Sequence, residues 1–203
     1  MFGGTFDPIH LGHMAAAEEA MCSMELDRVM FVPAGNPWLK DNSLLSDAVH
    51  RRNMVEIATG SNPNFGVSEI EVVRPGPSYS ADTLEYLSAE LGDEVELYSI
   101  IGADVLKDIR RWVRIHRVLE LSTIIIVHRS GFDRSELSFL QGLSVPKNPS
   151  LVVVEKPSIE ISGTQIRELS SQEKPISHLL PLGVAEYIKR HGLYACRGRG
   201  NSE

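Results

Sequence analysis

Two short stretches combine residue types that could hold a polyphosphate. In the first, Gly3-Gly4 precedes a turn at Asp7-Pro8 and a helix that opens with His10-Leu11-Gly12-His13. Glycine has no Cβ, so a phosphate chain could approach this backbone closely, and the turn could adopt positive φ. A helix that begins near His10 points unpaired N–H groups and its positive dipole end at an anion. His10 and His13 lie three residues apart and therefore share one helical face.

The second stretch is Ile161-Ser162-Gly163-Thr164-Gln165-Ile166-Arg167-Glu168. Ser162 and Gln165 have the spacing of a capping box, in which each side chain serves the other residue's backbone N–H. That structural interpretation requires neither Thr164 nor Arg167, which share one face beside the helix N-terminus. Because arginine supplies a planar fork of donors suited to phosphate, we interpret Arg167 as a phosphate ligand rather than a surface ion-pair partner.

The elements that must position these stretches alternate between helices and strands. Continuously apolar runs predict buried strands, and strand, helix and strand within about thirty residues predict a right-handed βαβ unit with a parallel sheet. Helical periodicity, caps and stop signals predict the helices. After a strand at the N-terminus, the expected strands cover 28–33, 67–73, 97–101, 123–127 and 151–155. The expected helices cover 11–24, 46–58, 80–91, 115–121, 136–143 and 179–190, and a further helix begins near Ser162. Ser46 and Ser80 are the expected caps of the second and third of these helices.

This pattern predicts an α/β fold with a doubly wound parallel sheet, in a single domain over residues 1–195. Residues 196–203 are polar and glycine-rich and are expected to form a flexible tail. Ligands of such sheets bind at the carboxyl ends of the strands, where strand order reverses. Gly3-Gly4 and Gly102-Ala103-Asp104 both follow predicted strands and should meet there. Neither a Walker A loop nor a Gly-x-Gly-x-x-Gly fingerprint occurs, which argues against a P-loop kinase and an NAD-dependent dehydrogenase.

Composition narrows the possible partners. The 203 residues are 42% apolar and carry a formal net charge of −7, which argues against a nucleic-acid-binding surface. An anionic substrate remains compatible, because charges are screened over about 8 Å and a few local cations outweigh distant carboxylates. Cys22 and Cys196 are too few for a disulfide framework or a metal site. With no apolar run long enough for a membrane span and no signal-peptide pattern, a cytoplasmic protein is expected.

Both phosphate-binding stretches resemble known motifs. Residues 3–13 are similar to Gly-Gly-Thr-Phe-Asp-Pro-x-His-x-Gly-His, the form that the nucleotidylyltransferase His-x-Gly-His signature takes in nicotinate/nicotinamide mononucleotide adenylyltransferases. Residues 161–167 resemble that family's Ile-Ser-x-Thr-x-x-Arg motif. Further segments resemble the family more weakly. Arg51–Met54 resembles its Arg-x-x-Met helix, Pro77–Leu84 its tyrosine segment, and Ile100–Asp104 its adenosine-side segment. Trp112 resembles its indole, and Gly192–Tyr194 resembles its usual ending.

The resemblance implies a Rossmann-like nucleotidylyltransferase that transfers the adenylyl group of ATP to nicotinate or nicotinamide mononucleotide, most like the bacterial nicotinate enzyme. It implies a place in NAD biosynthesis and Mg²⁺ carried mainly by the ATP phosphates. By position in the motifs, the implied catalytic residues are His10, His13 and Arg167. The implied ATP-binding residues are Gly4, Thr5, Phe6, Gly12, Lys40, Gly102, Asp104, Ser162 and Thr164, and the implied mononucleotide-binding residues are Tyr79, Ser80, Thr83 and Trp112.

Four departures from the family pattern keep alternatives open. The family's first strand normally carries more residues before Phe2, and Asn36-Pro37-Trp38-Leu39-Lys40 replaces its Pro-Pro-His-Lys. Ser80 stands where threonine is usual, and the tail after Tyr194 is additional. A transferase that adenylylates phosphopantetheine and a nucleotide sensor without turnover are the competing interpretations. Taken alone, Trp112 fits a core aromatic residue and Asp104 a helix cap. The preference between nicotinate and nicotinamide mononucleotide stays open, and so does the oligomeric state, for which a homo-oligomer is one alternative.

Overall fold

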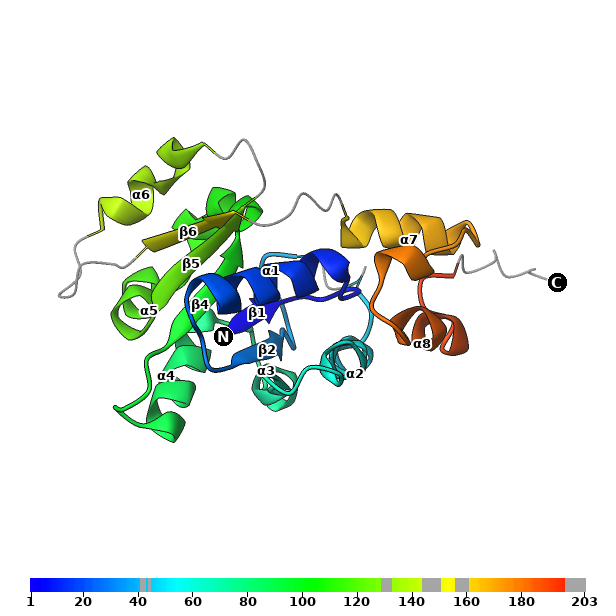
Figure 1. Ribbon diagram of the computed structural model, residues 1–203, viewed down its shortest axis with the longest axis horizontal. Coiled ribbons are helices and arrows are strands. Elements are labelled where there is room, and N and C mark those ends of the chain that lie inside the picture. The colour runs from blue at the N-terminus through cyan, green and yellow to red at the C-terminus, as the bar shows by residue number, and fades with distance from the viewer. Residues whose placement is uncertain (41–42, 44, 129–132, 144–150, 156–160, 196–203) are drawn as a thin grey trace.

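The computed structural model describes residues 1–40, 43, 45–128, 133–143, 151–155 and 161–195, and it contains one six-stranded parallel sheet (Figure 1). The strands are β1 (Phe2–Gly4), β2 (Val29–Pro33), β3 (Phe65–Val67), β4 (Tyr98–Gly102), β5 (Thr123–His128) and β6 (Leu151–Glu155). Their order is β3-β2-β1-β4-β5-β6, and every neighbouring pair is parallel. This is the doubly wound arrangement that the sequence predicted, with the reversal of strand order between β1 and β4.

Helices cover both faces of the sheet. One face packs against α1 (Leu11–Ser23), α2 (Ala48–Thr59), α7 (Gly163–Ser171) and α8 (Val184–Arg190). The other packs against α4 (Ser80–Leu91), the 3₁₀ helix η2 (Ala103–Arg111), α5 (Ile115–Leu121), and the short pair η3 (Arg134–Leu137) and α6 (Ser138–Gln141). Two further short helices are α3 (Ile70–Val73) and η4 (Ser177–Leu179). In Figure 1, α7 and α8 lie at one end of the molecule and α6 at the other.

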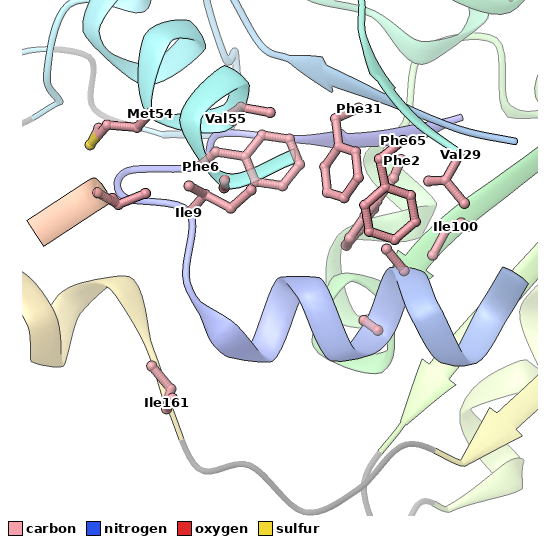
Figure 2. Packing of buried hydrophobic residues seen from close by; sticks show 14 of the residues in the cluster. Phe2, Phe6, Ile9, Val29, Phe31, Met54, Val55, Phe65, Ile100 and Ile161 are labelled. Atoms are coloured by element: carbon pink, nitrogen blue, oxygen red, sulfur yellow. The ribbon is translucent and has the colours of Figure 1, made fainter. Parts of the chain in front are cut away.

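The core consists of two hydrophobic layers, one on each side of the sheet. Alternate residues of β5 divide between them: Ile125 and Val127 belong to one layer, and Ile124 and Ile126 to the other. This alternation explains why the strand is apolar throughout, since both of its faces are buried. Figure 2 shows part of the first layer, where aromatic rings from β1, β2, β3 and the loop after β1 lie between the strands and helix α1. These rings are Phe2, Phe6, Phe31 and Phe65.

The central strand β1 is short but is paired on both sides. Phe2 faces Phe31 of β2 and Ile100 of β4. Met1 extends the pairing, because its nitrogen donates to the Tyr98 carbonyl at 2.6 Å and its carbonyl accepts from the Ile100 N–H at 2.9 Å. Burial lowers the pKa of the Met1 amino group to about 5. The loop that follows β1 therefore starts from a fixed position in the middle of the sheet.

Several predicted elements differ from the structure. The strand expected over 67–73 is wrong: β3 ends at Val67, and residues 70–73 form α3. A short apolar stretch fits a strand or a buried helix equally well, so periodicity could not decide between them. The helix expected over 136–143 is split between η3 and α6, and the one expected over 179–190 begins only at Val184 after a turn at Leu182–Gly183.

Two predicted caps are also wrong. Asp47, rather than Ser46, caps α2, because its carboxylate accepts from the Val49 N–H at 2.9 Å. Ser80 is the first residue of α4, and Tyr79 occupies the cap position without a side-chain hydrogen bond. The expected tail, 196–203, lies outside the described residues. In the described part of the chain, every helix is too short or too polar to cross a membrane.

Candidate active site

A cavity of about 1060 Å³ opens at the carboxyl ends of β1 and β4, where strand order reverses. Such switch points are the usual ligand sites of open α/β sheets. Every predicted site residue except Thr83 lines this cavity, so two motifs 150 residues apart in the sequence share one space. These lining residues are Gly4, Thr5, Phe6, His10, Gly12, His13, Lys40, Tyr79, Ser80, Gly102, Asp104, Trp112, Ser162, Thr164 and Arg167.

Thr83 corrects the predicted mononucleotide-binding set. Its side chain is fully buried, and its hydroxyl donates to a carboxylate oxygen of Glu71 at 2.6 Å. Glu71 lines the cavity and Thr83 does not. Burial raises the pKa of the Glu71 carboxyl, although the hydrogen bonds from Thr83 and Ser78 oppose the shift. Thr83 therefore supports the cavity through Glu71 instead of facing it.

His10 and His13 form a stacked pair at the start of α1. Their ring centroids are 3.7 Å apart and the rings are nearly parallel, with an interplanar angle of 19°. His10 occupies the cap position of α1, and its backbone N–H donates to Nδ1 of His13 at 3.2 Å. A neutral imidazole that accepts at Nδ1 carries its proton on Nε2. His13 thus caps the helix with one nitrogen and keeps the other as a donor.

The loop between β1 and α1 is shaped by Gly4 and Phe6. A Cβ on Gly4 would lie 2.8 Å from the Phe6 ring, so glycine at this position makes room for that ring. In this loop Phe6 takes the left-handed conformation, with a φ of 50°. The sequence had suggested the glycines for that conformation. The Phe6 ring is buried and meets the His13 ring edge-on at a centroid distance of 5.1 Å. Gly4 therefore serves the packing of this loop.

The start of α7 reaches the same loop. Ser162 caps α7 by accepting from the Gln165 N–H at 3.2 Å, as its spacing predicted. Arg167 donates from Nη1 to the Asp7 carbonyl at 2.7 Å and from Nη2 to the Thr164 hydroxyl at 3.2 Å. A Cβ on Gly163 would lie 2.9 Å from the Asp7 carbonyl oxygen. The absence of a side chain at 163 thus allows the N-terminus of α7 to approach Asp7.

Asp7 connects three other segments to the histidine loop. Its buried carboxylate accepts from the Tyr194 hydroxyl at 2.6 Å and from the Ser46 N–H at 3.3 Å. Its carbonyl accepts from Arg167. Burial, and then the Asp7 charge, raise the pKa of the Tyr194 phenol, so the hydroxyl stays protonated and donates. The C-terminal segment is therefore tied directly to the loop that carries His10.

Arg51 is a buried cation whose side chain donates to four backbone carbonyls. The residue is 2% exposed. Its Nη1 donates to the carbonyls of Thr5 at 2.9 Å and Ala34 at 2.5 Å, its Nη2 to Gly35 at 3.0 Å, and its Nε to Ser46 at 2.9 Å. The side chain thus links the loops after β1 and β2 to the start of α2.

Positive potential concentrates in this cavity despite the net negative charge of the chain. The N-termini of α1 and α7 both border it, and each contributes the positive end of its helix dipole. Lys40 and Arg167 also line it. Desolvation lowers the pKa of Lys40, and the nearby charge of Arg167 lowers it further, while Asp104 and Asp7 oppose the shift. These cations lie close enough to repel one another, so an anion bound between them would be stabilised.

Aromatic side chains line the cavity near Tyr79. Trp38 meets Tyr79 edge-on, with ring centroids 5.8 Å apart. Trp112 follows η2, packs partly against the second hydrophobic layer and also lines the cavity. The site therefore combines phosphate-binding groups with flat apolar surfaces suited to heterocyclic rings.

Sequence reasoning did not assign site roles to Asp7, Arg51, Glu71 or Tyr194. Arg51 and Tyr194 lie within segments that resemble the family, but neither spacing nor residue type indicated that Arg51 would bind carbonyls or that Tyr194 would reach Asp7. These contacts join residues 46 and 187 positions apart. No local signal in the sequence could have identified them.

Comparisons with known proteins identify the family of this chain. The cytidylyltransferase-like family model matches residues 1–169. A protein of Saccharopolyspora erythraea, named as a probable nicotinate-nucleotide adenylyltransferase, is 43% identical over 202 residues, which cover 100% of this chain and 91% of that protein. A Dehalococcoides mccartyi protein of the same name is 39% identical over 194 residues, covering 96% and 95%. The chain belongs to the nicotinate-nucleotide adenylyltransferase family.

Solved structures show the same fold for this adenylyltransferase chain. Plasmodium falciparum nicotinic acid mononucleotide adenylyltransferase complexed with NaAD aligns with a TM-score of 0.76 over 95% of both chains, at 21% identity. The same Plasmodium falciparum protein complexed with APC aligns with a TM-score of 0.74. At this identity the likeness establishes the fold. The Rossmann-like nucleotidylyltransferase architecture predicted from the sequence is thereby confirmed.

Proposed function

We propose that this chain transfers the adenylyl group of ATP to nicotinate mononucleotide, releasing pyrophosphate and forming the dinucleotide used in NAD biosynthesis. The observation that carries the proposal is the shared cavity, in which the starts of α1 and α7 meet beside Lys40, Tyr79 and Trp112. At about 1060 Å³ it slightly exceeds the range of roughly 300–1,000 Å³ typical of single-ligand pockets. Family membership supports the same reaction, since the relatives carry the name of this activity.

The reaction needs positioning and charge stabilisation more than proton transfer. The 5′-phosphate of the mononucleotide attacks the α-phosphorus of ATP, and the bond to the bridging oxygen of pyrophosphate breaks. A phosphate monoester is already an anionic nucleophile at pH 7, so no general base is required. The barrier comes from repulsion between two anions and from charge that develops on the α-phosphate and the leaving group.

The residues of the cavity match these requirements. In this proposal His13 donates from Nε2 to the phosphates, His10 lies stacked beside it, and Arg167 stabilises the charge of the departing pyrophosphate. Gly4, Thr5, Phe6, Gly12, Ser162 and Thr164 shape the phosphate channel, and Gly102 and Asp104 border the adenosine. Tyr79, Ser80 and Trp112 hold the mononucleotide, and Lys40 contributes a cation at the opening of the cavity.

Magnesium fits this site as a companion of ATP. Among the described residues, no group of three or more histidine, cysteine or acidic side chains gathers to hold a metal ion. Mg²⁺ is commonly bound through substrate phosphates and water together with one or two carboxylates. Asp104 is among the carboxylates that line the cavity and could bind water molecules around such an ion. The ion would supply neutralisation of phosphate charge. We place the reaction in the cytoplasm.

Pyrophosphate release tests the proposal and separates its competitors. The purified protein, with ATP and Mg²⁺, should release pyrophosphate with nicotinate mononucleotide and more slowly with nicotinamide mononucleotide. Turnover with phosphopantetheine alone would assign the chain to another branch of the superfamily. Calorimetric binding of ATP without turnover on any acceptor would identify a nucleotide sensor, and either result would overturn the proposal.

A further inference from the structure

The segment in which this chain departs from its family, Asn36–Lys40, is fastened to the aromatic part of the cavity. The Asn36 N–H donates to the Ser78 hydroxyl at 3.1 Å, and the Ser78 N–H donates back to the Asn36 carbonyl at 2.9 Å. This reciprocal pair fixes the loop against the residue that precedes Tyr79. Trp38 is consequently held in one position beside the Tyr79 ring.

Trp38 does not behave as a core residue. It belongs to neither hydrophobic layer among the described residues, whereas Trp112 packs partly against the second one. Its indole is only partly buried and lines the same cavity as Tyr79 and Trp112. The Arg111 guanidinium lies 6.0 Å from the centre of the Trp38 ring, at the outer limit of a cation–π contact. A large apolar ring that lines a cavity without joining the core is placed to contact a ligand.

The chemistry of the cavity identifies the part of a ligand that Trp38 would meet. Lys40, two residues farther along the same loop, interacts electrostatically with Arg167, Asp104 and Asp7 and therefore lies near the phosphate-binding groups. Trp38 instead contacts Tyr79. An electron-rich indole packs favourably against a flat, electron-poor heterocycle. A single loop thus presents a cation toward the phosphates and an aromatic ring toward a heterocycle.

We propose that Trp38 contacts the pyridine ring of the acceptor and, with Tyr79 and Trp112, determines that the acceptor must carry a planar heterocycle. This inference rests on the proposed function and adds a specificity residue to it. Trp38 takes no part in bond making or breaking. Its loss weakens binding of the mononucleotide and leaves binding of ATP unchanged.

Tryptophan fluorescence tests the contact without an activity measurement. The chain has only two tryptophans, so Trp112→Phe leaves Trp38 as the single indole, and Trp38→Phe leaves Trp112. Nicotinate mononucleotide should quench Trp38 emission in the Trp112→Phe protein, and ribose 5-phosphate, which lacks the ring, should not. If Trp112→Phe does not fold, the contribution of Trp38 is obtained by difference. It is the emission quenched in the unmodified protein minus the emission quenched in Trp38→Phe, which reports Trp112 alone. Unquenched Trp38 emission, or quenching by ATP alone, would overturn the inference.

Steady-state kinetics separates this inference from the proposed function. Trp38→Ala should raise KM for nicotinate mononucleotide about tenfold, keep KM for ATP within about twofold, and be largely rescued by Trp38→Phe. Tyr86→Ala, on the exposed face of α4, is the matched aromatic control and should change neither constant. An active unmodified enzyme with an unchanged Trp38→Ala KM would remove the inference alone. An unmodified enzyme that turns over no pyridine mononucleotide would remove the proposed function and the inference together.

Discussion

His13 combines a structural role with the chemical role that we propose for its second ring nitrogen. Its Nδ1 accepts from the His10 backbone N–H, which leaves Nε2 as the donor of a neutral ring. A glutamate at this third helical position would accept from the same N–H, but it would carry no second donor. The position therefore requires histidine only if the second nitrogen is used.

This division of roles gives a test at the level of the residue. His13→Ala should lower turnover at least a hundredfold, because losing one well-aimed donor typically costs ~3–4 kcal/mol of transition-state stabilisation. His13→Asn can retain an acceptor near the Nδ1 position, whereas His13→Gln can retain a donor near Nε2. We expect His13→Asn to unfold at the same urea concentration as the unmodified protein but to be as slow as His13→Ala, and His13→Gln to recover part of the rate. Near-normal turnover of His13→Ala would show that Nε2 does not act on the phosphates.

At the level of elements, the histidine loop depends on segments that are distant in sequence. Asp7 joins it to α7 through Arg167 and to the segment after α8 through Tyr194, and Arg51 of α2 joins it to the loop after β2. Each of these bonds satisfies a buried polar group that would otherwise be costly. The geometry of the site is thus set by contacts between elements rather than by the motif alone.

Tyr194→Phe tests whether the C-terminal segment supports the site. The substitution removes the hydroxyl that donates to the buried Asp7 carboxylate and should lower the free energy of unfolding by about 1–3 kcal/mol. Turnover should fall as well, because the Asp7 carbonyl also receives Arg167. Urea denaturation and the pyrophosphate assay measure the two effects. Tyr86→Phe, whose side chain is half-exposed, is the control and should leave both values unchanged. Equal stability of Tyr194→Phe and the unmodified protein would contradict a supporting role.

The same elements show what the sequence could predict. Long apolar runs such as Thr123–Val127 and the cap at Ser162 are local signals, and the structure confirms both. The strand predicted from Val67 to Val73 is wrong because these seven residues carry no decisive hydrophobic period. Its helical part, α3, lies in close contact with the loop at Gly35. The two motifs predicted to bind phosphate line one cavity. The contacts of Asp7 and Arg51 depend on the folded arrangement, which no local pattern encodes.

Across the whole molecule, a negatively charged surface surrounds a site built for anions. The formal net charge is −7, yet Lys40, Arg167 and two helix N-termini line the cavity. The attraction of an anion to this cavity depends on the charges that line it rather than on the net charge of the chain, because exposed charges are screened over about 8 Å. Glu71 is one of the acidic residues that also line the cavity; the residue is 6% exposed, and burial raises the pKa of its carboxyl.

Glu71 makes the stability of the whole fold depend on pH in a predictable direction. Burial raises its pKa above the ordinary value of 4.5, so its contribution to stability is fully present below pH 4.5 and is lost as the pH rises through the folded-state pKa. Glu71→Gln is neutral at every pH and can still accept from the Thr83 hydroxyl. The variant should therefore gain stability relative to the unmodified protein between pH 5 and 8, by ~1.4 kcal/mol for each tenfold change in the ionisation constant of Glu71.

Urea denaturation of both proteins at pH 5 and pH 8 measures this difference, and titrations elsewhere in the molecule cancel between them. Glu94→Gln, at an exposed site outside the cavity, is the matched control and should show a difference that is nearly independent of pH. Arg74 opposes the shift at Glu71 and Asp82 adds to it, so both substitutions must be compared at the same ionic strength. A Glu71→Gln difference that stays constant would mean that folding does not shift the ionisation of Glu71, and one that falls as the pH rises would mean that the folded protein stabilises the carboxylate. Either result would contradict the prediction.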